Sequence, residues 1–301
     1  MLFSQRLPVS LLLLLAFSAP AAAQLAPVTG LNSLTEIPQA QLSHHDRSPL
    51  ALKALALNPQ EWKHAETEHF IYHFQKSYVA TPVSVEAEFH FRVVAKELGQ
   101  TAAGWPEKAH IYIFERPADW ESFQSVGGLE PWTGGIQSGR SLFLVRNPAY
   151  KFTDNSLGHE IVHLLVRRWY GERIPLWLNE GLAQYLSKNA HASYLRARGY
   201  MAKPSSSAVA AEKFFPLTVL ATMSYPPADQ VEAFYDQSER LVRFFAAADK
   251  PKFLELLGNL ARGETFHVAV PRLFSAHYSS IAALEERFRA YAVTGAASSE
   301  Q

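Results

Sequence analysis

Two histidines and two glutamates stand at a spacing that suits metal-dependent hydrolysis. His159, Glu160 and His163 form the pattern His-Glu-x-x-His, and Glu180 follows in a later segment. Positions four apart on an α-helix project from one face about one turn apart, so both imidazoles can point at a single ion. Glu160 lies about 100° round the helix from His159, where its carboxylate can reach a water on that ion.

Glu180 supplies the third ligand that a hydrolytic zinc site needs. A short break at Gly171 and Pro175 separates it from His163, which suits a helix, a turn and a returning helix. Catalytic zinc commonly takes three protein ligands and keeps a fourth position for water, and two histidines with one glutamate are an established set. The pattern therefore predicts Zn²⁺ as the cofactor, with Glu160 as the general base.

Two helices must position these groups. We expect the first to begin near Asp154, whose carboxylate would cap it, and to run to about Trp169. The second should start at Pro175, which suits a first helical turn, and carry the apolar residues Trp177 and Leu178.

The surrounding pattern divides the chain into a mixed part before the metal helix and a helical part after it. Alternating polarity predicts half-buried strands at 67–74 and 108–114. We expect a further strand at 141–145. Apolar residues at helical spacing predict helices at 49–57, 83–98 and 118–126, and later at 216–223, 231–248, 252–262, 265–274 and 281–291.

Composition narrows the class of protein. Lys plus Arg and Asp plus Glu both number 28 among 301 residues, so no excess charge favours nucleic acid or an anionic membrane as a partner. The first 23 residues combine Arg6, an apolar run and the small residues Ala21 to Ala23, which is typical of a cleavable signal peptide. We expect export to a bacterial periplasm or secretion, with no membrane span in the mature chain. The sequence holds no cysteine, so no disulfide supports it.

From these signals we divide the chain into a signal peptide (1–23), a lead-in (24–60), an α/β metal-binding part (61–190), a helical part (191–294) and a tail (295–301).

The two motifs resemble those of the peptidase MA-like family, the gluzincin branch of zinc metallopeptidases. Its members carry His-Glu-x-x-His and a downstream Trp-x-Asn-Glu-Gly-x-Ala, which stand here at 159–163 and 177–183. Looser similarity extends to 67–71, 234–245 and 263–285, over roughly four fifths of the mature chain.

This resemblance implies an α+β, zincin-like fold. A small mixed β-sheet would pack on the active-site helix, an all-helical C-terminal half would follow, and a cleft between them would hold zinc at its floor. The edge strand would be 136–145, which would pair with the backbone of an extended peptide or protein substrate.

Further site residues are candidates. Tyr235 could donate a hydrogen bond to the developing oxyanion, with Tyr225 and His191 as weaker candidates. Asn179 could orient Glu180 or simply cap the backbone locally. Many gluzincins place an acidic residue one turn after the third ligand, where this chain has Gln184, whose amide oxygen could accept the second N–H of a bound histidine.

Three functions compete. The motifs favour an exported zinc endopeptidase that hydrolyses peptide bonds. An aminopeptidase is the first alternative, because Gly127-Gly128-Leu129-Glu130-Pro131 distantly resembles the Gly-x-Met-Glu-Asn motif of the aminopeptidase N family. The second alternative is a non-catalytic binding protein of the cell envelope that retains the fold, although every ligand and base position is filled here.

Overall fold

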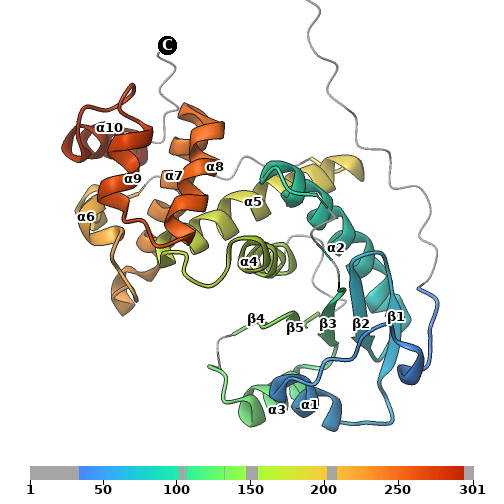
Figure 1. Ribbon diagram of the computed structural model, residues 1–301. Helices are drawn as coiled ribbons and strands as arrows, with labels where there is room; N and C mark the ends of the chain where they lie inside the picture. Colours follow the sequence, from blue (N-terminus) through green and yellow to red (C-terminus); the bar gives the residue numbers. More distant parts are fainter. Residues whose placement is uncertain are drawn as a thin grey trace, which may run out of the picture.

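A computed structural model describes residues 34–101, 105, 107–131, 133–146, 155–201 and 209–294. The expected signal peptide, the tail and the expected helix cap at Asp154 lie outside these ranges. Within them a sheet is covered by helices on both faces, and a group of helices extends beyond one end of it (Figure 1).

The sheet has five strands in the order β1-β2-β3-β5-β4. Strands β2, β3 and β5 run parallel, while β1 and β4 pair antiparallel at the two edges. The bounds are β1 (Lys63–Glu66), β2 (Phe70–Phe74), β3 (Ala109–Phe114), β4 (Gly135–Ser138) and β5 (Ser141–Val145).

The expected single edge strand at 136–145 was wrong. Gly139 has a positive φ of 59° and forms a tight turn with Arg140, so the chain reverses there into two antiparallel strands. Strand β4 alone is the edge, and β5 lies inside the sheet between β3 and β4.

Side chains of the inner strands alternate between two cores. Ile111 and Ile113 of β3 enter the large core, which contains α2 (Ser77–Glu97), α4 (Ser156–Tyr170) and α5 (Leu176–Ala197). Tyr112 and Phe114 enter a smaller core on the other face, with α1 (Pro49–Ala56) and α3 (Pro117–Gly127) (Figure 1). Strands β2 and β3 are therefore buried along their whole length, and the expectation that they were half-buried was wrong because α1 and α3 cover the second face.

The C-terminal half is helical, as expected. It consists of α6 (Leu217–Leu220), α7 (Val231–Ala248), α8 (Lys250–Ala261), α9 (Phe266–Leu273) and α10 (Ile281–Thr294). Short 3-10 turns lie at Gln39–Gln41, Ala211–Lys213 and Ala228–Gln230. Helix α5 links the two halves and runs without a break through the division expected at residue 190; Pro175 stands just before its first residue rather than inside its first turn.

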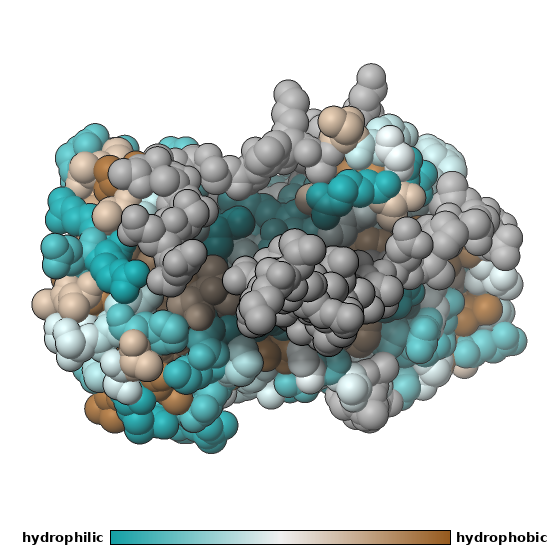
Figure 2. Space-filling view, turned by 90° about the horizontal axis from the view of Figure 1, so that it is seen from above, coloured by the Kyte–Doolittle hydropathy of each residue, from teal (hydrophilic) through white to brown (hydrophobic). Residues whose placement is uncertain are grey.

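The visible surface is mainly hydrophilic. In the described part of the face shown in Figure 2, hydrophobic residues are scattered among hydrophilic ones rather than gathered in one patch. The large apolar side chains that are most exposed come from separate elements, among them Tyr78, Met201 and Tyr225. Among the described helices, none is both long and apolar enough to cross a bilayer.

Candidate active site

Helices α4 and α5 bring the three predicted ligands to one point. The Nε2 atoms of His159 and His163 lie 3.0 Å apart, and each lies 3.5 Å from Oε2 of Glu180. The three side chains are 20%, 13% and 12% exposed, so the group is largely withdrawn from water but still partly accessible to it. The spacing of four on α4 and the turn into α5 thus produce the convergence that the sequence predicted.

The electrostatics of the group favour a negative carboxylate among the imidazoles. Burial opposes ionisation of Glu180, but the neighbouring imidazoles of His159 and His163 lower its pKa to about 2. Burial likewise disfavours protonated His163, and Glu180 outweighs this effect and raises the His163 pKa. The group is therefore an anion surrounded by nitrogen donors, which suits a divalent cation.

Glu160 lies beside this group and under strand β4. A Cβ built on Gly135 would lie 3.4 Å from the Glu160 Cγ and 3.8 Å from its Oε1, so the strand backbone passes directly over the carboxylate. Burial raises the Glu160 pKa, the two histidines oppose that rise, and the backbone N–H of Gln137 donates to the carboxylate. The sequence did not single out Gly135 or Gln137, since their role depends on how β4 crosses α4.

Gly181, which directly follows Glu180, sets the approach of α7. A Cβ on this residue would lie 2.5 Å from the backbone oxygen of Ser238 and 2.8 Å from Cγ2 of Val242. No side chain fits between the two helices here, so only glycine permits this contact. The glycine of the second motif therefore has a structural cause that the pattern alone did not reveal.

The same approach places Tyr235 of α7 at the site. Its hydroxyl hydrogen-bonds Glu180, and burial together with the charges of Glu180 and Glu160 raises its pKa to about 12. The phenol thus stays protonated and can donate a hydrogen bond at any ordinary pH. Tyr225 lies close to Tyr235 but is 77% exposed.

The remaining candidates differ in position. Asn179 hydrogen-bonds His163 and helps to raise the pKa of that imidazole, and its expected role in orienting Glu180 stays a prediction. Among the described residues no hydrogen bond joins the Gln184 amide to either histidine ligand, so its predicted role stays a prediction. His191 lies further along α5 in a second group with Glu86 and His90, which the sequence did not reveal.

Comparison with known proteins identifies the family. A sequence profile described as Peptidase MA superfamily matches residues 93–294, and the chain belongs to this superfamily. The expected family is confirmed, and so is the α+β fold class, with a small mixed sheet packed on α4 and a helical C-terminal half. No curated protein matches the chain.

Two similar solved structures are an M1 zinc metallopeptidase from Deinococcus radiodurans and a mutant of that enzyme. Each is 13% identical, and the alignment covers 74% of this chain and 47% of theirs, with TM-scores of 0.40 and 0.39. The chain therefore spans about half the length of these metallopeptidase structures.

Proposed function

We propose that this protein is an exported zinc-dependent endopeptidase. The observation that carries the proposal is the convergence of His159, His163 and Glu180, whose donor atoms lie 3.0–3.5 Å apart, with Glu160 beside them. Membership of the Peptidase MA superfamily supports the same conclusion. The segment at 1–23, with its basic start and apolar run, supports export.

The donors fit a zinc ion. Oε2 of Glu180 is buried and has no hydrogen-bond partner among the described residues, which would cost free energy unless a cation occupied the position. Two imidazole nitrogens and one carboxylate oxygen are a usual donor set for catalytic zinc. His159, His163 and Glu180 would hold the ion, which when bound polarises a carbonyl and lowers the pKa of water.

The other groups then have separate tasks. Glu160 accepts the proton of the attacking water and delivers it to the leaving amine, and its raised pKa helps it to hold that proton between the two steps. Tyr235 keeps its proton and donates a hydrogen bond to the oxygen of the scissile carbonyl as negative charge develops there.

Strand β4 supports a peptide as the substrate. It is an edge strand of the sheet, and among the described residues no further strand pairs with its outer side. An extended peptide can add to such an edge through main-chain hydrogen bonds, which do not depend on its sequence. Because β4 also passes over Glu160, a peptide held there would present its backbone to the catalytic group.

The position of the glycine-rich loop favours internal cleavage over aminopeptidase activity. Gly127 packs near Leu50 and Leu129, which border the smaller core on the face of the sheet away from α4. Glu130 is exposed, and its backbone oxygen accepts a hydrogen bond from the side-chain amide of Gln124 on α3. An anchor for a substrate amino terminus would need to lie beside Glu160 and the predicted ligands.

The test is cleavage of an internally quenched peptide library whose members carry blocked or free amino termini. Wild-type protein should cleave blocked peptides, lose this activity with a chelator and regain it with zinc. Glu160→Gln should abolish cleavage and retain zinc, whereas Glu172→Gln, a matched change at an exposed carboxylate, should have no effect. Cleavage of free-amine peptides alone would indicate an aminopeptidase, and zinc binding without any cleavage would indicate a binding protein.

A further inference from the structure

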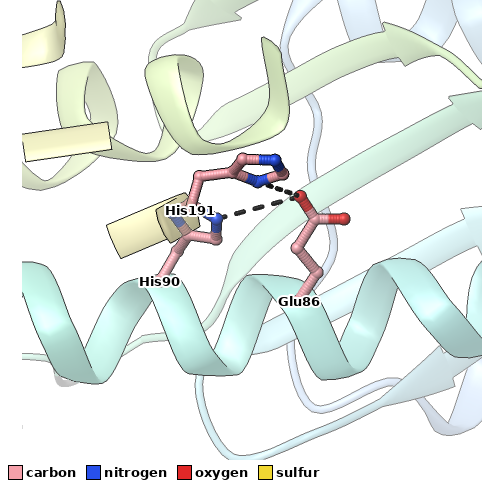
Figure 3. A group of neighbouring side chains, drawn as sticks. All are labelled: Glu86, His90 and His191. Carbon is pink, nitrogen blue, oxygen red and sulfur yellow. Dashed lines mark ion pairs between the residues drawn. The ribbon is translucent and has the colours of Figure 1, made fainter. Parts of the chain in front are cut away.

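A second group of metal-ligating side chains lies between α2 and α5. Glu86 and His90 stand one turn apart on α2, and His191 reaches them from α5 (Figure 3). Oε1 of Glu86 lies 3.8 Å from Nε2 of His90 and 3.9 Å from Nδ1 of His191. The donor set, two imidazoles and one carboxylate, is the same as that of the active site.

This group is separate from the catalytic one. His191 follows Glu180 on the same helix by eleven positions, which is about 16 Å at the α-helical rise. None of the three side chains has a task in the proposed hydrolysis. All three are nonetheless withdrawn from water, with exposed fractions of 5% for Glu86, 0% for His90 and 12% for His191.

His90 is the observation that points to a ligand. Its ring is fully buried, and neither nitrogen has a hydrogen-bond partner among the described residues. Leaving buried polar atoms unsatisfied costs roughly 1–3 kcal/mol each. Burial, with His191 and Arg146 nearby, lowers the His90 pKa to about 3, so the ring is neutral and has a lone pair to offer.

The surroundings hold His90 and Glu86 in place. A Cβ on Gly158 would lie 2.4 Å from Cε1 and 2.7 Å from Nδ1 of His90, so the ring is packed against the backbone of α4. Nη2 of Arg146 donates to Oε2 of Glu86 at 2.6 Å, which leaves Oε1 directed at the two imidazoles (Figure 3). Such outer contacts orient ligands in metal sites.

We propose that Glu86, His90 and His191 form a second zinc site that ties α2 to α5 behind the catalytic helix. Tetrahedral ligands at about 2.1 Å from zinc lie about 3.4 Å apart, so the observed separations need to close by about half an ångström. Zinc reaches the group past His191, the most exposed of the three. Through the contact of His90 with Gly158, the ion stabilises the helix that carries His159.

Zinc stoichiometry tests this proposal independently of any peptidase activity. The double variant His159→Gln/His163→Gln disables the first site and leaves the second intact. After dialysis against buffered zinc, elemental analysis should give two zinc ions per chain for the wild type and one for the double variant. Adding Glu86→Gln to the double variant should remove the last ion, while adding His267→Gln, at an exposed histidine, should not.

Two results would overturn the proposal: a double variant that binds no zinc, or one whose zinc survives Glu86→Gln. If Glu86→Gln does not fold, X-ray absorption at the zinc edge of the double variant decides the matter without changing the second group. Two imidazoles in the coordination shell support the proposal, and a shell of water or of a single imidazole contradicts it.

Discussion

Replacing Gly181 with alanine should weaken the contact between α5 and α7 and disturb the active site. The new Cβ would lie 2.5 Å from the carbonyl oxygen of Ser238 and 2.8 Å from its carbonyl carbon, so α7 must move by about half an ångström or more. Overpacking costs about 1–3 kcal/mol, and a backbone neighbour places this case near the upper limit. Alanine regains about 1 kcal/mol of helix propensity, which leaves a net loss of about 2 kcal/mol.

Urea unfolding followed by circular dichroism measures this loss, and peptide cleavage measures its consequence for Tyr235 on the displaced helix. The matched control is Gly258→Ala in α8, where the new Cβ meets only the flexible end of Arg262 at 3.3 Å. That variant should gain about 0.5–1 kcal/mol. If Gly181→Ala is as stable and as active as Gly258→Ala, the proposed close packing of the two helices is wrong.

Three further predictions follow from the contacts described above. Tyr235→Phe should lower kcat by about 10²-fold or more without loss of zinc, because it removes the oxyanion donor, and an unchanged kcat would exclude that role. His110 is neutral in the folded protein because burial lowers its pKa to about 4, with Asp46 opposing this effect, whereas the unfolded chain takes up a proton below about pH 6.5. The free energy of unfolding therefore falls as the pH is lowered, and this group contributes about 2 kcal/mol of the fall between pH 7 and pH 5. Urea titrations at the two pH values should show that His110→Gln reduces the fall by that amount. Equal falls in the variant and the wild type would contradict this role of His110. Trp177→Ala should cost about 3–5 kcal/mol, because the indole is fully buried against Phe266, and an unchanged urea midpoint would show that this packing contributes little.

The sequence predicted those features that depend on local pattern. The apolar spacing at 231–248 matches α7 residue for residue, and the apolar run at 141–145 matches β5, because in each case the pattern lies within the segment itself. The ligands His159, His163 and Glu180 were recognisable for the same reason, since a helix, a turn and a helix fix their relative positions.

Features that depend on distant segments were not predicted. Strand β1 is four residues long and has no apolar alternation, so only its pairing with β2 reveals it. The reversal at Gly139 was missed because the family resemblance suggested one edge strand across 136–145, although Ser138-Gly139 is a dipeptide that favours a turn. Glu86 and His90 are visibly one turn apart on a predicted helix, but the arrival of His191 depends on how α2 and α5 cross.

Crystallography of the zinc-loaded protein tests the central claim most directly. Diffraction data collected on both sides of the zinc absorption edge should give an anomalous peak about 2.0–2.2 Å from the Nε2 atoms of His159 and His163 and from a carboxylate oxygen of Glu180. Glu160 should approach this ion without binding it. A saturated crystal with no peak among these three residues would contradict the assignment of the site as a hydrolytic zinc centre.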